Sequence, residues 1–448
     1  MLVTSFILFA GLAATPAALL EKTLPVRITG AWTIEVGPGA IVVDGVAREV
    51  PKAVPFSIAP GVRVAVRDEP FPALPVYNEN AGGWVRGAQP SGIKTEECTA
   101  AGAIYPETIK VKPGPGGAAP FVPDKDYRVE AYWGTVGRIE GGGIKPDQPI
   151  YIDYDYAANR LDSICLDARG TLSLLEGKPG LGSQYPAGPQ AGSVAVLNLF
   201  VTGKTERLTD DNLFPIEFRE TPKPVPGASA AEKLLPKTLA KLRAGAPVTY
   251  VAWGDSVTAG GGVGADKTKW YQQIFADRLQ KRFPASAVTL RTAAWPGGNS
   301  SGYMNAPKGG VYDYQRDVLD PKPDLVSIEF VNDAGLDEAG VKAHYAKILS
   351  DLRGVGAEVI LITPHLVRPD WLKSDTMKFD EDPRAYVRGL RLFAAESQVA
   401  LADASRGWCM LWRQGIPYMT LEANSINHPD LRGHTIFADA LMGLFPEK

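Results

Sequence analysis

The stretch Val248-Thr-Tyr-Val-Ala-Trp-Gly-Asp-Ser-Val-Thr-Ala-Gly260 decides the fold of the second half of the chain. Apolar side chains dominate from Val248 to Trp253, and Gly254-Asp255-Ser256 then breaks the run. This pattern predicts a buried strand that ends in a tight turn with a serine at its tip. Parallel α/β sheets build their sites at the carboxyl ends of strands, so Ser256 is the first candidate functional residue.

Strand-like and helix-like segments alternate from residue 248 to the end of the chain. Short apolar runs predict strands, and apolar residues spaced three and four apart predict amphipathic helices between them. This alternation is typical of a parallel sheet covered by helices on both faces. We therefore expect residues 231–448 to form one α/β domain, with strands at 248–253, 287–293, 325–330, 358–363 and 399–403 and helices at 231–242, 269–282, 338–353, 384–397 and 433–444.

Residues 24–217 follow a different pattern. Short runs such as Val62-Arg-Val-Ala-Val66 and Ile150-Tyr-Ile-Asp-Tyr-Asp-Tyr156 alternate apolar and polar side chains, and Gly and Pro punctuate them densely. Period-two alternation with frequent turns predicts a β-rich, antiparallel accessory domain, which we interpret as a sandwich. Residues 218–230 are polar and contain three prolines, which is typical of a linker.

The first 20 residues are apolar and small, and no charged side chain lies between Leu2 and Leu20. Residues 5–14 have the character of the apolar core of a signal peptide, and Thr15-Pro16-Ala17 that of a cleavage site. We therefore expect a secreted or periplasmic protein, with a buried strand or a truncated membrane anchor as the alternatives. No later apolar run is long enough to span a bilayer, so the mature chain is expected to have no membrane span.

Composition excludes several partners. The 448 residues carry a net charge of -3 and no basic run, which argues against nucleic acid and anionic membranes. No phosphate-binding glycine pattern follows the strand at 248–253, so we expect no cofactor. The cysteines are widely spaced and form no cluster with histidine, so we expect no metal site. Cys98 and Cys165 either pair in an exported protein or stay as separate thiols.

Four polar segments fall at the ends of predicted strands or at the start of the last helix. Since the carboxyl ends of parallel strands meet at one edge of the sheet, we expect the four segments to lie together. They are Gly254-Asp255-Ser256, Trp295-Pro-Gly-Gly-Asn-Ser-Ser301, Phe330-Val-Asn-Asp333 and Asn427-His428-Pro429.

In these segments the chain resembles the SGNH (GDSL-type) hydrolase and esterase family over about residues 245–446. The Ser, Gly, Asn and His that name the family match Ser256, Gly298, Asn332 and His428. The resemblance implies a three-layer α/β/α domain with a five-stranded parallel sheet. It also implies a carboxylic ester hydrolase, and many members of the family remove acetyl groups from polysaccharides.

The resemblance assigns a role to each residue. His428 would take the proton of Ser256 and later deliver it to the leaving alcohol. The backbone N–H groups of Ser256 and Gly298 and the side-chain amide of Asn332 would stabilise the oxyanion. We prefer Gly298 to Gly297 because the residues that follow it best match the polar pair after the family's glycine.

One departure concerns the acid that orients the histidine. The family carries an aspartate three residues before it, and Ser425 occupies that position here. Glu422 and Asn424 are the neighbouring substitutes, and a Ser-His dyad held by a backbone carbonyl is the alternative. We interpret the remaining polar residues as structural: Asp255 and Asp333 in turns, His434 in packing or capping, His344 on the surface and His365 near the pocket rim.

The leading hypothesis is a secreted serine esterase that removes O-acetyl groups from an acylated small molecule or polysaccharide, with the β-rich domain in a binding or positioning role. Trp253, Trp270, Trp295 and Trp371 lie near predicted strand ends or in neighbouring loops, where they either stack on sugar rings or serve ordinary packing. A second hypothesis is a catalytically weak or inactive SGNH-like domain in a surface or appendage binding protein. A third is acyl transfer to a sugar, since the same serine serves both reactions.

Overall fold

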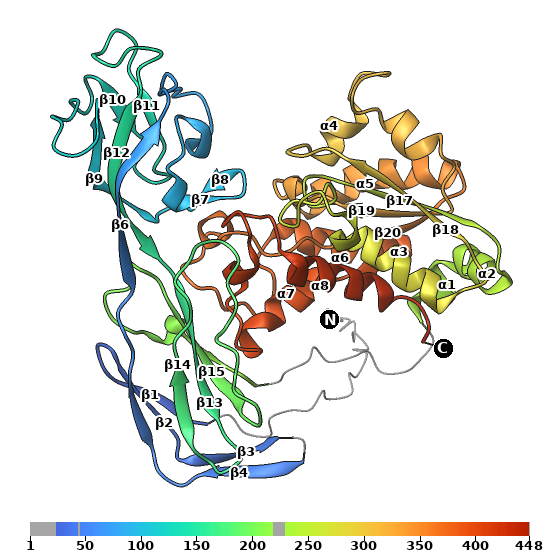
Figure 1. Cartoon of the computed structure of the whole chain (residues 1–448). Coiled ribbons are helices and arrows are strands. Elements are labelled where there is room, and N and C mark those ends of the chain that lie inside the picture. The colour runs from blue at the N-terminus through green and yellow to red at the C-terminus, as the bar shows by residue number, and fades with distance from the viewer. Residues whose placement is uncertain (1–23, 44, 218–228, 448) are drawn as a thin grey trace, which may run out of the picture.

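The computed structural model describes residues 24–43, 45–217 and 229–447. The expected signal peptide and residues 218–228 of the expected linker lie outside these ranges. Figure 1 shows an elongated β-rich part, here called the N-terminal region (24–217), beside an α/β part, the C-terminal region (229–447). The exact domain boundaries stay a prediction.

The C-terminal region contains the expected parallel sheet. Its five strands have the order β18-β17-β19-β20-β21, and every pairing is parallel. The fold class expected from the sequence is therefore confirmed. The strands are β17 (Val248–Gly254), β18 (Val288–Ala294), β19 (Leu325–Glu329), β20 (Glu358–Ile362) and β21 (Ala400–Ala402).

Helices cover both faces of this sheet because alternate residues of β17 point to opposite sides. Tyr250 and Ala252 belong to the core under one set of helices, and Val251 and Trp253 to the core under the other. The first set is α1 (Ala230–Leu234), α2 (Pro236–Ala244), α3 (Tyr271–Arg282) and α8 (Leu431–Met442). The second is α5 (Glu338–Gly354) and α6 (Ala385–Ser397).

Three details differ from the expected helices. The helix expected at 231–242 is split after Leu235, because Pro236 has no N–H to continue the helical hydrogen bonds and instead begins α2. Two short helices, α4 (Ser300–Met304) and α7 (Ala404–Met410), were too short to show a helical period.

The N-terminal region is β-rich and antiparallel, as expected, but a sandwich is not confirmed. Apolar side chains gather in two separate cores, one around Ile34 and Leu199 and one around Ile104 and Ile152. The sheets are β1-β2-β5 (Val26–Gly30, Thr33–Val36, Val54–Ser57), β3-β4 (Gly39–Val43, Val46–Val50), β6-β12-β9 (Val62–Phe71, Ile150–Ala158, Ile104–Lys112), β14-β13-β15-β16 (Leu172–Leu175, Arg160–Leu166, Val194–Val201, Leu213–Pro215), β10-β11 (Tyr127–Val129, Val136–Arg138) and β7-β8 (Lys94–Thr95, Cys98–Thr99).

The two regions are joined by hydrogen bonds and by apolar packing. Thr95 Oγ1 donates to the Asn424 carbonyl at 3.0 Å, and Asn198 Nδ2 donates to the Gly415 carbonyl at 2.7 Å. Hairpin β7–β8 points from the N-terminal region towards the C-terminal region (Figure 1). Cys98 of this hairpin packs with Trp133 and Ile426 in a small buried cluster. The hairpin is therefore part of the contact between the regions.

Two further expectations concern the cysteines and the membrane. Cys98, Cys165 and Cys409 are all buried free thiols, so Cys98 and Cys165 do not pair.

No helix within residues 24–43, 45–217 and 229–447 is long and apolar enough to cross a membrane.

Candidate active site

Ser256 lies in the turn directly after β17, with 8% of its surface exposed. The next strand in sequence, β18, pairs with one side of β17, and the strand after it, β19, pairs with the other side. The order of strands therefore reverses at β17. Open α/β sheets form a crevice at such a switch point, beyond the carboxyl ends of the strands. The fold therefore places Ser256 at the edge of the sheet where such sheets bind ligands.

Gly254 allows this turn to pack tightly. A Cβ at this position would lie 2.1 Å from Thr258 Oγ1 and 2.3 Å from the Glu329 carbonyl oxygen. Both distances are far below van der Waals contact, and the second involves backbone that cannot simply rotate away. Glycine is thus required for steric reasons immediately before the Asp255-Ser256 pair.

Asp255 joins the serine turn to the segment after β19. Its Oδ1 accepts a hydrogen bond from the Val257 N–H at 3.1 Å, and its Oδ2 accepts one from the Asn332 N–H at 3.1 Å. The side chain is fully buried, and this burial raises the pKa of Asp255 to about 7. The contacts are those of a turn-forming residue, the role that the sequence predicted.

Asn332 and Gly298 are brought together. Asn332 lies in a short 3-10 helix, η6 (Val331–Asp333), and its Nδ2 donates to the Gly298 carbonyl at 3.0 Å. The Gly298 N–H donates to the Trp295 carbonyl at 2.9 Å, so it would have to share its hydrogen with an oxyanion. A Cβ on Gly298 would lie 2.6 Å from Trp295 Cγ, which excludes any larger residue there.

His428 packs beside the serine turn across Gly261. A Cβ built on Gly261 would lie 3.0 Å from the His428 ring and 3.0 Å from the Ser256 carbonyl oxygen, so both groups surround the same point. Among the described residues, the Ser256 hydroxyl has no hydrogen-bond partner. Catalytic hydrogen bonds are often long in a site without substrate and tighten when it binds.

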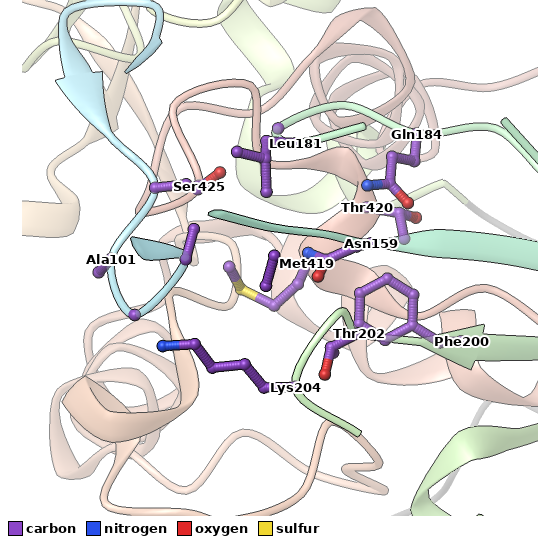
Figure 2. A pocket seen from close by; sticks show the side chains of 15 residues that line it. Ala101, Asn159, Leu181, Gln184, Phe200, Thr202, Lys204, Met419, Thr420 and Ser425 are labelled. Atoms are coloured by element: carbon purple, nitrogen blue, oxygen red, sulfur yellow. The ribbon is translucent and has the colours of Figure 1, made fainter. Parts of the chain in front are cut away.

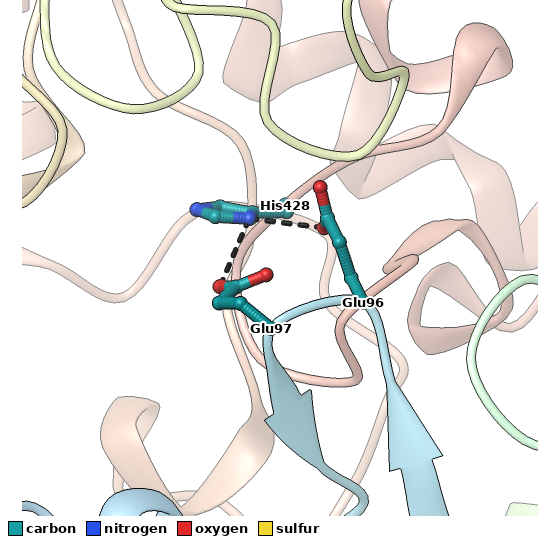
Figure 3. A group of neighbouring side chains, drawn as sticks. All are labelled: Glu96, Glu97 and His428. Atoms are coloured by element: carbon teal, nitrogen blue, oxygen red, sulfur yellow. Dashed lines mark hydrogen bonds and ion pairs between the residues drawn. The ribbon is translucent and has the colours of Figure 1, made fainter.

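The other side of the imidazole faces two glutamates of the N-terminal region (Figure 3). His428 Nδ1 lies 3.1 Å from Glu96 Oε2 and 3.2 Å from Glu97 Oε1. Both residues form the tip of hairpin β7–β8. More than 300 residues of sequence separate them from His428, and no local pattern links the two. The sequence signal that was available is two adjacent glutamates in a tight turn, where Gly and Asn are usual.

This arrangement sets the protonation of the imidazole. Burial favours its neutral form, but the hydrogen bonds to Glu96 and Glu97 outweigh burial and raise the pKa of His428 to about 10. Burial likewise opposes ionisation of Glu97, yet the hydrogen bond from His428 lowers the pKa of Glu97 to about 2. The free site thus contains an imidazolium that faces ionised carboxylate.

The residues expected to orient His428 have other partners. Ser425 adopts a left-handed backbone (φ +60°) and lines a cavity of about 280 Å³ between the regions (Figure 2). Glu422 is fully buried, neither of its carboxyl oxygens has a hydrogen-bond partner among the described residues, and burial raises its pKa well above the usual value. Neither Ser425 nor Glu422 therefore hydrogen-bonds to the imidazole.

Asn424 acts on the loop and on Glu97, and it does not contact the ring. Its Oδ1 accepts the N–H groups of Ile426, Asn427 and His428 at 2.9, 2.9 and 3.0 Å. Its Nδ2 donates to Glu97 Oε1 at 3.0 Å. Asn424 therefore fixes both the backbone of His428 and the carboxylate that faces it.

The other histidines hold backbone or side chains in place. His434 is buried, accepts from the Tyr271 N–H through Nδ1 and donates from Nε2 to the Gly261 carbonyl, and burial lowers its pKa to about 4. His365 Nε2 donates to the Asn427 carbonyl at 2.8 Å. His344, expected on the surface, instead lies 2.7 Å from Ser300 Oγ.

Asp333 belongs to the same buried network. It accepts the Ser300 N–H at 3.0 Å and the Tyr345 hydroxyl at 2.8 Å. These contacts connect the segment of Asn332 to the start of α4 and to α5. The structural role expected for Asp333 agrees with this geometry.

The fold thus brings a serine at the strand-order reversal close to a histidine and an asparagine, an arrangement typical of α/β hydrolases. Residues 252–436 match the model of the GDSL-like Lipase/Acylhydrolase family. This part of the chain is therefore a domain of that family of ester hydrolases, and it contains Ser256, Gly298, Asn332 and His428.

Several solved structures are similar to the chain. A two-domain esterase active on acetylated mannans is 18% identical, with 48% of this chain and 53% of that chain covered and a TM-score of 0.37. A catalytic variant of an acetylxylan esterase from Geobacillus stearothermophilus is 20% identical (44% and 92% covered, TM-score 0.33). An alpha/beta hydrolase enzyme from the metagenome of Lake Arreo, Spain, is also 20% identical (44% and 94% covered, TM-score 0.34).

The match spans about half the length of the two-domain esterase. No curated protein matches the chain.

The first prediction tests the packing of the turn. Gly254→Ala should lower the free energy of unfolding by about 1 to 3 kcal/mol, because the added methyl collides with Thr258 and the Glu329 backbone. Chemical denaturation measures this difference. Gly335→Ala is the matched control, since no atom lies within 4 Å of the Cβ it would add. Equal stability of the two variants would contradict the steric argument.

Proposed function

We propose that the chain is a serine esterase that hydrolyses O-acyl groups, in particular O-acetyl groups on carbohydrate, through an acyl-enzyme on Ser256. The observation that carries this proposal is the position of Ser256 at the strand-order reversal with the His428 imidazole packed beside it across Gly261. A serine hydroxyl is a weak nucleophile and needs such a base.

The first half of the reaction acylates the serine. As Ser256 Oγ forms a bond to the ester carbonyl carbon, its proton passes to His428. Glu96 and Glu97 occupy Nδ1, so Nε2 is the nitrogen left for this proton. The tetrahedral intermediate then collapses, the bond to the alcohol oxygen breaks, and His428 protonates the leaving alcohol.

The second half returns the enzyme to its initial state. Water attacks the acyl carbonyl and gives its proton to His428, and the carboxylic acid leaves as Ser256 recovers its proton. Both tetrahedral intermediates carry an oxyanion. The Ser256 N–H, which has no other partner among the described residues, and the Asn332 amide are suitable donors for it, with the Gly298 N–H as a shared third.

The catalytically weak or inactive alternative rested on Ser425 in place of an acid and on the long β-rich region. Two carboxylates from the N-terminal region now face the imidazole from the side where that acid would act. This contact supports a working hydrolase over the inactive alternative, and we favour the former. Secretion and the signal peptide stay predictions, because residues 1–20 lie outside the described ranges.

Exposed aromatic side chains beside the histidine loop support a carbohydrate substrate. Trp371, in the short 3-10 helix η7 (Pro369–Leu372), and Tyr132 are 47% and 46% exposed. Both flank the Arg368 guanidinium, at 5.8 and 5.1 Å from the ring centres. The Arg368 N–H donates to the Ile426 carbonyl at 2.9 Å, so this aromatic pair adjoins the loop of His428. The flat apolar faces of such exposed aromatic rings suit the apolar face of a sugar.

The other three tryptophans considered for sugar stacking do not offer such a face. Trp253 is fully buried, and Trp295 stacks on Tyr312 with ring centres 4.5 Å apart. Trp270 donates from Nε1 to the Gly264 carbonyl at 2.8 Å, and Lys267 Nζ lies over its ring, 5.6 Å from the ring centre. Among the four, Trp371 is thus the one that fits a stacking role.

The central prediction concerns the nucleophile. Ser256→Ala should lower kcat for a short-chain aryl acetate by about 10⁴-fold or more, since no other group can form the acyl-enzyme. Steady-state hydrolysis measures this effect, and a fluorophosphonate should label the wild-type chain but not the variant. Ser301→Ala, at an exposed serine of α4, is the control and should keep full activity. Hydrolysis that survives Ser256→Ala would refute the proposal.

The oxyanion donor gives a separate prediction. Asn332→Ala should lower kcat by about 10²- to 10³-fold and leave KM nearly unchanged, because the amide acts on charge that develops only in the transition state. Thermal unfolding checks that the loss of the Gly298 contact does not unfold the variant. Asn305→Ala, at the end of α4, is the matched control. A change in KM alone would assign Asn332 to substrate binding instead.

The aromatic surface can be tested through selectivity. Trp371→Ala should raise KM for an acetylated oligosaccharide by about 3- to 10-fold, corresponding to about 0.5 to 1.5 kcal/mol of lost stacking. KM for an aryl acetate should not change, because that substrate has no sugar ring to stack on Trp371. Leu392→Ala, at a similarly exposed apolar side chain of α6, should change neither value. Equal effects on both substrates would contradict a sugar-binding role.

A further inference from the structure

The tip of hairpin β7–β8 has an unfavourable backbone for its residues. Thr95 pairs with Cys98, which leaves only Glu96 and Glu97 in the loop. Glu96 adopts a left-handed conformation, with φ +51°. Two-residue hairpin loops favour Asn and Gly because these residues tolerate positive φ. The contacts of the Glu96 side chain therefore have to offset this backbone strain.

Glu96 bridges the serine side and the histidine side of the site. Its Oε1 accepts the Gly262 N–H at 2.9 Å, and its Oε2 faces His428 Nδ1. Gly262 itself packs against the histidine loop, because a Cβ there would lie 2.1 Å from the Pro429 carbonyl oxygen. Glu96 therefore fixes the position of the glycine loop after Ser256 relative to the His428 imidazole.

Glu97 is held by the histidine loop itself. Its Oε1 accepts from Asn424 Nδ2 at 3.0 Å and lies 3.2 Å from His428 Nδ1. The same Asn424 accepts the backbone N–H of His428. The carboxylate and the ring that it faces thus share one anchor, which fixes their relative position.

We propose that Glu96 and Glu97 are positioning residues for His428, so that the N-terminal region completes the catalytic site of the C-terminal region. This inference rests on the proposed function of Ser256 and His428. The carboxylates accept the Nδ1 hydrogen, present Nε2 to Ser256, and balance the positive charge when the imidazole holds the serine proton. They thereby take over the task of the aspartate that Ser425 replaces.

The hairpin is held firmly enough for this task. Besides the buried cluster of Cys98, Trp133 and Ile426, the Arg368 guanidinium lies 4.7 Å from the Trp133 ring centre. The Arg368 backbone is bonded to Ile426, two residues before His428. The stacking of Arg368 on Trp133 and its backbone hydrogen bond to Ile426 therefore hold hairpin β7–β8 against the loop that contains His428.

The two carboxylates also determine the pH dependence. His428 accepts the serine proton only in its neutral form, so kcat/KM should rise with pH as the imidazolium loses its proton. Removing negative charge lowers the His428 pKa and moves this rise to lower pH, while poorer orientation lowers the maximum. The titratable groups around His428 are Glu96, Glu97, Asp255, Glu422, His365 and His434.

The experiment compares full-length wild type with Glu96→Gln, Glu97→Gln and the double variant. Glutamine keeps the size and loses the charge. Glu107→Gln, at an exposed glutamate of β9, is the charge-matched control. One readout is the pH profile of kcat/KM for an acetate ester. The other is the NMR titration of His428, which is practical in a chain with four histidines and does not need activity.

In the double variant we expect the His428 titration to move down by about 1 to 3 pH units. The rise of kcat/KM should move with it, and the maximum should fall by about 10²- to 10⁴-fold. Glu107→Gln should change neither readout. Smaller shifts in the same direction in the two single variants would support a shared role.

An unchanged His428 titration and pH profile in the double variant would overturn the inference, while Ser256-dependent activity would still support the proposed function. Conversely, an inactive wild-type chain whose His428 titration shifts in the double variant would overturn the proposed function and support the contact itself.

The side chains of Glu96, Glu97 and His428 also place their possible ligand atoms within 4.8 Å of one another. Activity lost to a chelator and restored by Zn²⁺ would overturn the positioning role in favour of a metal site.

Discussion

The position of β17 inside the sheet is the constraint on which the site depends. Because β18 pairs with one edge of β17 and β19 with the other, the segments that follow all three strands meet above its end. Asp255 fixes the serine turn relative to Asn332, since its buried carboxyl group accepts N–H groups from both segments. The serine and the oxyanion amide are thus held by backbone contacts at the sheet edge.

Three buried carboxyl groups of the C-terminal region resist ionisation. Asp255, Glu329 and Glu422 are fully buried, and desolvation raises the pKa of each. Glu97 behaves in the opposite way, because the hydrogen bond from His428 lowers its pKa to about 2. The negative charge that acts on the imidazole is therefore concentrated on the hairpin of the N-terminal region rather than on these three buried carboxyl groups of the C-terminal region.

The sequence predicted those parts of the structure that local pattern controls. Apolar strands alternating with amphipathic helices indicated the parallel sheet. Ser256, Asn332 and His428 were proposed as site residues because each lies near an element boundary and matches a motif of the family that the chain resembles. The partners of His428 could not be found in this way, because they depend on how the two regions dock. Similarly, alternation along the N-terminal strands indicated one buried face per strand but not which strands share a core, so two cores formed where we expected one sandwich.

Docking and proton transfer are linked in this arrangement. The Glu96 and Glu97 carboxylates attract an imidazolium more strongly than a neutral imidazole, so the contact between the regions tightens whenever His428 holds a proton. By the same linkage, any movement that withdraws the hairpin makes protonation of His428 less favourable and weakens its action as the base for Ser256. The N-terminal region therefore need not touch the substrate to control the reaction, because it holds the charge that the histidine requires.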